Sequence, residues 1–157
     1  MSVFSTIFEK LELVKDKDLL REIHGDSFQS ATGAQISDWV ARARTSLKEA
    51  GVSPGTRVGL LSPNSNQWVA ADLAIIAQKA VVVPLYARQE PKELAEMLED
   101  CGAELVLCSS QDLEDGLSKA WPKVSDKDAP KTIVFEQLFN SEPSQDKPEL
   151  PESDDLV

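Results

Sequence analysis

The sequence predicts an α/β fold: an open, mostly parallel, doubly wound sheet with helices on both faces, preceded by an N-terminal helical segment. Apolar runs begin near residues 57, 80, 104 and 132, and stretches with helical periodicity separate them. The runs at residues 58–61 and 80–86 are continuously apolar, which is typical of strands buried on both faces. The apolar stretch 66–77 between them predicts the crossover helix that a parallel pair requires. The resulting order βαβαβαβ is flavodoxin-like or Rossmann-like.

Composition divides the chain into three parts. We expect an N-terminal helical segment at residues 1–25, an α/β subdomain at 26–139 and an acidic, proline-rich linker at 140–157. The linker contains three prolines, six acidic residues and one lysine, so it offers almost nothing to bury. Residues 154–157 turn apolar again, as though another strand were about to begin, which suggests an incomplete protein.

The N-terminal segment carries an amphipathic pattern. Apolar side chains recur at helical spacing along residues 4–14: Phe4, Ile7, Phe8, Leu11 and Val14. The favoured interpretation is a short helix docked on its own domain, and contact with a partner subunit or an absent part of the protein is the alternative. Leu19, Leu20 and Ile23 continue as a second small apolar stripe, and residues 24–27 read as a turn.

A capping signal marks the longest predicted helix. Thr32 and Gln35 have the spacing of a capping box, in which each side chain bonds the other residue's backbone N–H. Gly51 suits the left-handed position after a helix, and Val52 follows to make the hydrophobic contact. A helix over residues 33–50 is therefore predicted.

The later elements repeat the alternation of strand and helix. Pro91 and Gly102 bound a helix with an inward apolar stripe. Residues 104–108 and 132–135 read as the third and fourth strands. The apolar face along residues 113–121 predicts one more helix between them, which the proline at position 122 stops.

The charge balance argues against several classes of function. The 27 acidic residues outnumber the 16 basic ones, and the net charge of −11 opposes binding to nucleic acid or an anionic membrane. The N-terminus lacks the pattern of a secretory signal, and no apolar run approaches bilayer length. We therefore expect a cytoplasmic protein without a transmembrane segment. Cys101 and Cys108 are too few for a metal site or a disulfide framework and read as buried thiols.

Common catalytic motifs are missing from the sequence. It contains no P-loop, no dinucleotide-binding glycine fingerprint, no zinc-protease histidine pair and no nucleophile-elbow serine. His24 is the one histidine and lies in an expected loop, where a structural or solvent-exposed role is favoured. We assign no catalytic residue and no metal ligand.

Candidate ligand-facing residues lie at the expected strand ends, because open α/β sheets bind ligands at the carboxyl ends of their strands. They are Ser62, Asn64, Ser65, Tyr86 and Arg88. Asn64 and Ser65 precede the central helix, where capping is favoured over binding of an anion at the positive helix end. Tyr86 and Arg88 offer a ring and a fixed cation for a ligand wall; a rim tyrosine beside a surface salt bridge is the alternative.

Several sequence marks occur in a fixed order along residues 20–135. They are the run GVSPGTRV at 51–58, the triplet PNS at 63–65 followed by Trp68, the strand VVVPLY, and the helix end ELAEMLEDCGA. In this order and spacing the chain resembles the N-terminal part of the adenylate-forming acyl-CoA synthetases, the AMP-binding superfamily. The combination WVAADLAI followed by VPLYAR looks more like the long-chain fatty acyl branch than like other branches.

Two departures from this family pattern matter. The family usually carries glycine where this chain has Lys79, just before the VVVPLY strand, so the turn geometry there can differ. The family's phosphate loop, adenylate-binding motif, ribose-binding aspartate and C-terminal domain with its catalytic lysine are missing. In the family a DDL-type sequence often precedes the strand before the phosphate loop, and residues 154–157 fit that position. The chain therefore looks like a fragment that stops before the chemistry begins.

The resemblance implies a two-step reaction for the whole enzyme. Fatty acid and Mg-ATP give acyl-adenylate and pyrophosphate, and the CoA thiol then displaces AMP. ATP, Mg and CoA would serve the full-length protein, with none expected on this chain, which should be inactive alone. Its partners would be the missing remainder of the synthetase and those substrates, and exposed apolar surface makes a homodimer possible. A free-standing flavodoxin-like binding module without ligase chemistry is the alternative.

Overall fold

The computed structural model describes residues 3–152 and residue 155, and contains two sheets. β1 and β2 form an antiparallel hairpin, and the four other strands form a parallel sheet in the order β4-β3-β5-β6. The elements in chain order are α1 (Val3–Leu13), β1 (Asp18–His24), β2 (Ser27–Thr32), α2 (Gly33–Glu49), β3 (Arg57–Leu61), α3 (Asn66–Ile76), β4 (Val81–Leu85), α4 (Pro91–Cys101), β5 (Leu105–Cys108), α5 (Gln111–Ala120), the 3-10 turn η1 (Trp121–Lys123), β6 (Lys131–Val134) and α6 (Phe135–Leu138).

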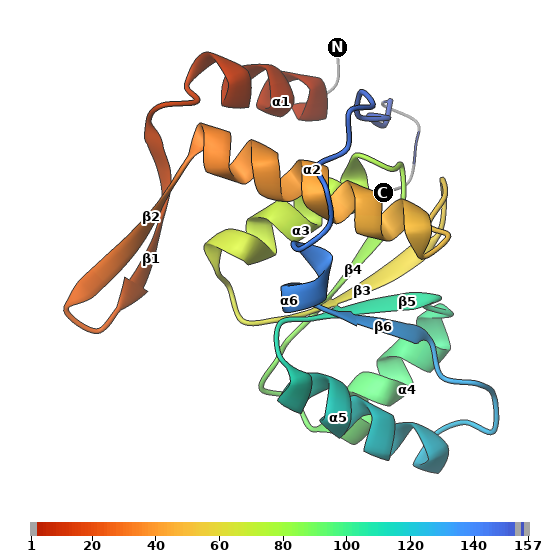
Figure 1. Cartoon of the computed structure of the whole chain (residues 1–157). Helices are drawn as coiled ribbons and strands as arrows, with labels where there is room; N and C mark the ends of the chain where they lie inside the picture. Colours follow the sequence, from red (N-terminus) through yellow and green to blue (C-terminus); the bar gives the residue numbers. More distant parts are fainter. Residues whose placement is uncertain (1–2, 153–154, 156–157) are drawn as a thin grey trace.

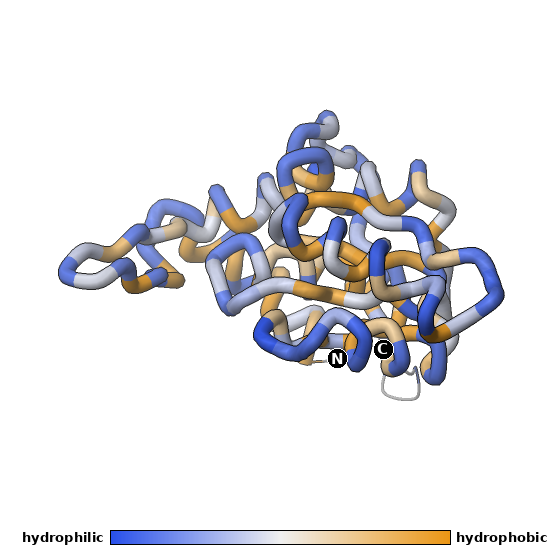
Figure 2. The backbone as a smooth tube through the Cα atoms, turned by 90° about the horizontal axis from the view of Figure 1, so that it is seen from below, coloured by the Kyte–Doolittle hydropathy of each residue, from blue (hydrophilic) through white to orange (hydrophobic). Residues whose placement is uncertain are grey.

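Helices cover both faces of the parallel sheet, which confirms the predicted doubly wound fold. α2, α3 and α6 lie on one face, and α4 and α5 lie on the other, while α1 packs outside α2 (Figure 1). The side chains between these layers form two apolar clusters, one on each face of the sheet. Figure 2 shows apolar segments through the middle of the body and a hairpin that projects away from it. Burial on both faces explains why β3 and β5 read as continuous apolar runs.

The local signals in the sequence produce the predicted helix ends. The Thr32 hydroxyl accepts from the Gln35 N–H at 3.2 Å, and the Gln35 side-chain oxygen accepts from the Thr32 N–H at 2.9 Å. Gly51 has φ +92° and Gly102 has φ +64°, the left-handed conformation that glycine adopts without a steric penalty. The capping box and the two glycine positions are therefore confirmed.

Residues 18–24 form a strand, so the second apolar stripe does not continue the N-terminal helix. Gly25, with φ +59°, lets the chain reverse, and Ile23 then pairs with Phe28 across the hairpin. A strand places alternate residues on opposite faces, and here Leu20 packs on the core while Ile23 is 79% exposed. The fourth strand also ends earlier than predicted, because Phe135 begins the short helix α6.

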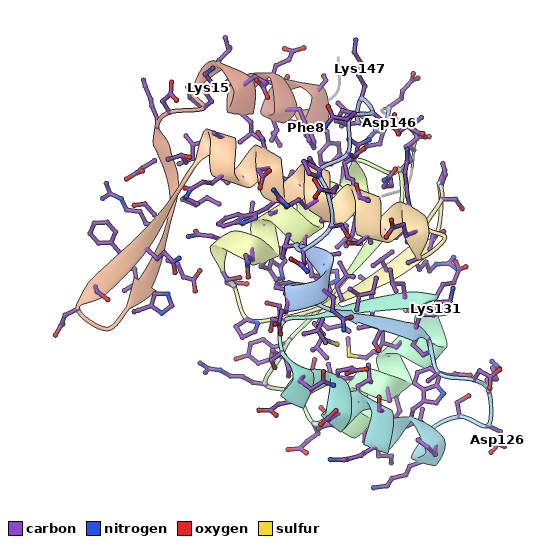
Figure 3. All side chains as sticks on the ribbon, in the orientation of Figure 1. Phe8, Lys15, Asp126, Lys131, Asp146 and Lys147 are labelled. Atoms are coloured by element: carbon purple, nitrogen blue, oxygen red, sulfur yellow. The ribbon has the colours of Figure 1, made fainter. Side chains whose placement is uncertain are left out.

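Residues 141–152 of the predicted linker, here called the strap, pack against the body. The Arg44 guanidinium donates to the carbonyl oxygens of Asp146 and Lys147 at 2.7 and 2.9 Å. The Glu149 N–H donates to Ala77 O at 3.0 Å, and the Pro151 side chain is fully buried. Figures 1 and 3 show the strap running from α6 across α2, with Asp146 and Lys147 near α1. Of the residues predicted to approach another strand, Asp154, Leu156 and Val157 lie outside the described part of the chain.

The length of the helices and the burial of the two cysteines complete the description of the fold. In the described part of the chain, no helix has the length and apolar character needed to cross a bilayer. Cys108 is buried as predicted, and burial raises the pKa of its thiol to about 12. Cys101 is only half-buried, and its thiol donates to Leu98 O at 3.5 Å.

Candidate functional site

The carboxyl ends of β3 and β4 line a cavity of about 670 Å³. Leu61 pairs with Leu85 in the parallel ladder, so the residues that follow each strand emerge at the same edge of the sheet. Four of the five candidate residues line this cavity: Ser62, Asn64, Tyr86 and Arg88. Trp68 from α3 adds a second aromatic side chain to the lining. The parallel topology thus brings together residues that are more than 20 positions apart.

The lining of this cavity combines apolar surface with one positive charge. Tyr86 is 62% exposed and Arg88 is also exposed, and Arg88 forms no ion pair with any residue that the structure describes. The surface salt bridge considered as an alternative for Arg88 is therefore not seen there. The lining contains no carboxylate, so the charge of Arg88 is not neutralised locally. Such a wall suits a ligand with an apolar or ring portion and an anionic group.

The two polar residues after β3 differ in their availability to a ligand. Ser62 is 5% exposed, and its hydroxyl donates to Pro63 O at 2.7 Å, which turns its one proton towards the loop backbone. Asn64 is exposed and lines both this cavity and a second cavity of about 340 Å³ beneath the hairpin. Asn64 is the polar side chain from this loop that a ligand would meet.

Ser65 serves as the N-cap of α3, which was the favoured interpretation of its sequence position. Its hydroxyl accepts from the Trp68 N–H at 3.0 Å, and its extended backbone (φ −154°, ψ 169°) is typical of the N-cap position. It lines the smaller cavity beneath the hairpin and not the one beside Tyr86. Among the predicted residues, Ser65 is therefore the one that does not line the cavity beside Tyr86, and it shares the smaller cavity with Asn64.

Glu22 occupies the positive end of α3, and sequence reasoning missed it. Its carboxylate oxygen Oε2 accepts from the Asn66 N–H at 3.0 Å, where an external anion was considered. Its other oxygen, Oε1, lies 3.1 Å from His24 Nε2. No local signal could reveal the contact with Asn66, because these residues are far apart in sequence and meet only through the hairpin.

The cavity does not lie at the point where the winding of the sheet reverses. The chain proceeds from β3 to β4 on one side and then to β5 on the other, so the reversal falls between β3 and β5. There the Ser109 N–H donates to Leu61 O at 3.0 Å, and the Ser110 hydroxyl accepts from the Leu113 N–H at the start of α5. These bonds keep the two strand ends together, and the described opening lies one strand away, between β3 and β4.

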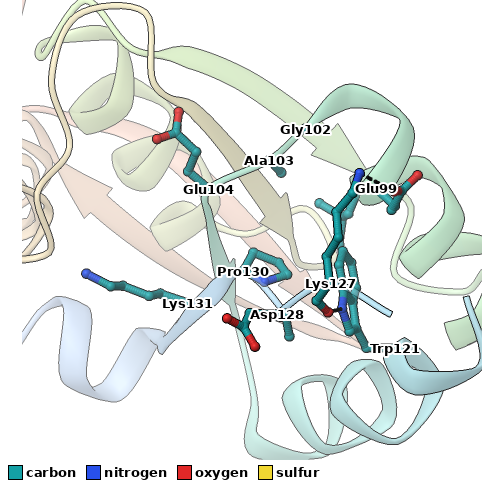
Figure 4. A pocket seen from close by; sticks show the side chains of 11 residues that line it. Glu99, Gly102, Ala103, Glu104, Trp121, Lys127, Asp128, Pro130 and Lys131 are labelled. Atoms are coloured by element: carbon teal, nitrogen blue, oxygen red, sulfur yellow. Dashed lines mark hydrogen bonds and ion pairs between the residues drawn. The ribbon is translucent and has the colours of Figure 1, made fainter. Parts of the chain in front are cut away.

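Another cavity, of about 350 Å³, lies at the opposite edge of the sheet (Figure 4). Its lining includes Trp121, whose indole N–H donates to Lys127 O at 2.9 Å. Lys127 Nζ in turn lies 2.8 Å from Glu99 Oε1, as the dashed lines in Figure 4 mark. The Trp121 indole and the Lys127 ammonium are thus bonded within the chain, so we do not treat this cavity as the ligand site.

Within the described residues, no group of three or more histidine, cysteine or acidic side chains is arranged to hold a metal ion. The residues at the ends of β3 and β4 form a cavity with one fixed cation, Arg88. We identify no paired acid and base within it, and it supports binding more directly than bond-making chemistry.

Comparisons with known proteins agree with this fold. Residues 9–157 match the protein family described as AMP-binding enzyme. A feruloyl-CoA synthase from Amycolatopsis is 36% identical over 91 residues, which is 58% of this chain and 18% of that enzyme. A long-chain-fatty-acid–CoA ligase from Mycobacterium bovis is 26% identical over 102 residues, which is 65% of this chain and 17% of that ligase. The chain thus spans less than a fifth of the length of these relatives.

Solved structures support the same assignment of fold. A benzoate CoA ligase from Burkholderia xenovorans superimposes on 99% of this chain with a TM-score of 0.77 at 22% identity, and the match covers 31% of that ligase. The family match extends over nearly the whole chain. The chain therefore belongs to the family described as AMP-binding enzyme.

Proposed function

We propose that this chain is the N-terminal part of an AMP-forming, long-chain fatty acyl-CoA ligase. The whole enzyme would convert fatty acid and Mg-ATP to acyl-adenylate and pyrophosphate, and the CoA thiol would then displace AMP. The observation that carries the proposal is the family match over residues 9–157. The long-chain assignment is supported by the VPLYAR sequence pattern and by the similarity to a long-chain ligase. Feruloyl-CoA synthase is also similar, so the acyl group has to be tested directly.

The cavity at the ends of β3 and β4 is the part of this chain that we propose to face substrate. Tyr86 and Trp68 would pack against the apolar or ring portion of a ligand, and Arg88 would bind its anionic group. We assign ATP, Mg and CoA chemistry to the remainder of the ligase, and the cytoplasmic location stays a prediction.

The direct test uses the full-length protein that contains this chain. ATP–pyrophosphate exchange is measured with hexadecanoate, ferulate and oxalate as alternative acids. We expect exchange with hexadecanoate, at a rate at least tenfold higher than with the other two acids. A tenfold ratio of rates corresponds to a difference of about 1.4 kcal/mol in transition-state free energy. Faster exchange with ferulate or oxalate would refute the long-chain proposal while leaving the ligase reaction in place.

Two charge variants test the role of the cavity in the same assay. R88Q removes the positive charge from the lining, and K119Q removes one from the exposed surface of α5 as a matched control. We expect R88Q to raise the KM for one of the anionic substrates and K119Q to leave the KM of every substrate unchanged. Equal behaviour of the two variants would exclude the cavity as the substrate-facing part.

Binding experiments with the isolated chain address the alternative of a free-standing binding module. We expect calorimetry with ATP, CoA and hexadecanoate to give no binding heat, because the proposed sites need the rest of the ligase. Saturable binding of any of these to the isolated chain would favour the module.

We also propose that the isolated chain self-associates. Ile23 and Phe28 expose apolar side chains on the hairpin, at 79% and 59% exposure, and large exposed apolar surfaces favour association. Light scattering that shows a monomer at high concentration would contradict this.

A further inference from the structure

The hairpin and the loop of the candidate cavity are joined by polar contacts at the start of α3. The Asn66 backbone N–H donates to Glu22 Oε2, and the Asn66 side-chain Nδ2 donates to Gln29 O, each at 3.0 Å. Asn66 is 5% exposed, Glu22 is half-buried and Gln29 is exposed, so both bonds are partly shielded from water. One residue of α3 thus bonds both strands of the hairpin, and we call Glu22, Gln29 and Asn66 the clasp.

The bond from Glu22 satisfies a donor that the helix cannot satisfy. Asn66 is the first residue of α3, and the first N–H groups of a helix have no acceptor within the helix. Ser65 caps the Trp68 N–H, which leaves the Asn66 N–H for Glu22. A carboxylate at this end also interacts favourably with the helix dipole. The contact is therefore a capping interaction supplied from a distant part of the chain.

Apart from the clasp, the hairpin is held at its base, where the Gly33 N–H donates to Lys17 O at 3.2 Å and the Ala34 N–H donates to Lys15 O at 2.8 Å. Two-stranded hairpins are marginally stable on their own in water, and most of the β1 and β2 side chains are exposed. Leu20 and Ala31 pack against the core at the base of the hairpin. Further out, the hydrogen bond seen between β1 and α3 in the described residues is that of Glu22.

Asn64 connects the clasp with the candidate cavity along the chain. It lies two residues before Asn66, and it lines both the cavity beside Tyr86 and the one beneath the hairpin. The loop between Leu61 and Asn66 is held by the β3 ladder at one end and by the clasp at the other. The position of Asn64 in the wall therefore depends on both.

We propose that Glu22 is a positioning residue for the candidate site, and that it sets the loop of residues 62–65 by clasping the start of α3. The inference rests on the proposed function in one respect, since the cavity is the part we propose to face substrate. The contact itself is independent of any ligase activity.

The test measures the clasp and the loop separately by NMR on the ¹⁵N-labelled chain. Because the Asn66 N–H has no partner in the helix, its hydrogen exchange reports the bond to Glu22 and not the opening of α3. We expect E22A to speed this exchange about tenfold or more, the protection that a hydrogen bond to a charged group provides. E22Q keeps a neutral acceptor of the same size, so its exchange should fall between those of E22A and wild type.

The amide resonances of Ser62, Asn64 and Ser65 are expected to shift in both Glu22 variants. E9Q removes a carboxylate from the exposed surface of α1 and is the matched control that should leave these resonances in place. Gly59 in β3 reports global stability and should keep its exchange rate in E22Q.

Unchanged exchange at Asn66 in E22A would overturn the clasp, and faster exchange without a shift at residues 62–65 would overturn the positioning role. If E22A unfolds the hairpin, E22Q answers both questions because it preserves the side-chain volume. None of these readouts needs turnover or a bound substrate. A failure here is therefore distinct from failure of the ligase proposal, which the exchange assay with hexadecanoate decides.

Discussion

Lys79 adopts a left-handed conformation, with φ +53°. It stands at the position where the family that this chain resembles usually carries glycine. The Lys79 N–H donates to Ile76 O at 2.9 Å, and the Ala80 N–H donates to Ile75 O at 3.3 Å. This pair of bonds is the Schellman arrangement that ends many helices, and its left-handed residue is usually glycine. The turn therefore keeps the geometry suited to glycine while carrying a lysine.

The energetic effect of this lysine can be worked out against two substitutions. A side chain in the left-handed region costs about 1–2 kcal/mol relative to the right-handed one. Glycine avoids this cost but loses about 0.5–1 kcal/mol more than alanine through the entropy of the unfolded chain. K79G should therefore be about 0.5–1 kcal/mol more stable than K79A. Both variants lose the ion pair between Lys79 Nζ and Asp155, 3.1 Å apart, so that contact cancels in the comparison.

Thermal and urea denaturation, both followed by circular dichroism, measure this difference. For a chain of 157 residues we expect K79G to melt roughly 1–4 °C above K79A. The slope of unfolding against urea should be the same in both, since the exposed area does not change. If K79A equals or exceeds K79G in stability, the left-handed turn does not carry the strain that we assign to it.

Three further substitutions test the packing and the electrostatics of the fold. In G59A the new Cβ would lie 2.8 Å from Leu98 Cδ2, so we expect about 1–3 kcal/mol of overpacking in urea denaturation; undiminished stability would contradict the close approach. R44M removes two hydrogen bonds between Arg44, which is 3% exposed, and the strap, and should lower the free energy of unfolding by about 2 kcal/mol or more. It should also speed amide hydrogen exchange at Glu149, and an unchanged exchange rate there would mean that the strap is held without Arg44. Burial raises the pKa of Asp72, so the ionised carboxylate opposes folding at neutral pH, and this cost disappears when the carboxyl group is protonated in acid. D72N should therefore raise the melting temperature at pH 7 but not near pH 3. An equal gain at both pH values would exclude the charge as the cause.

The sequence was sufficient to predict the parallel sheet because each strand carries its own signal. β3 and β5 are nearly all buried and therefore read as apolar runs, and glycine or proline marks both ends of α4. The hairpin was misread because Leu19, Leu20 and Ile23 fit a helical stripe as well as a strand. A short apolar pattern does not distinguish the helical period from the strand period, and pairing with residues 27–32 makes this segment a strand.

The candidate site was predictable only where topology alone determines position. Tyr86 and Ser62 follow paired parallel strands, so their meeting at one edge follows from the order of the strands. The contact of Glu22 with Asn66 depends on how the hairpin folds back over α3, and no local pattern encodes it. The strap was likewise missed because its backbone carbonyls, and not its side chains, bind Arg44.

The turn at the end of α3 also anchors the strap, which gives the unusual lysine a role that glycine cannot fill. Ala77 O accepts from the Glu149 N–H, Gln78 forms a parallel bridge with Glu149, and the Lys79 ammonium pairs with Asp155. The parallel bridge at Gln78 thus holds Glu149 of the strap beside the start of β4, and Lys79 pairs with Asp155 just beyond the strap. Because glycine would relieve the backbone strain and remove the Lys79 ion pair, the stability of K79G relative to wild type measures which effect is larger. A gain would mean that the left-handed cost dominates, and a loss would mean that the ion pair contributes more than the backbone strain.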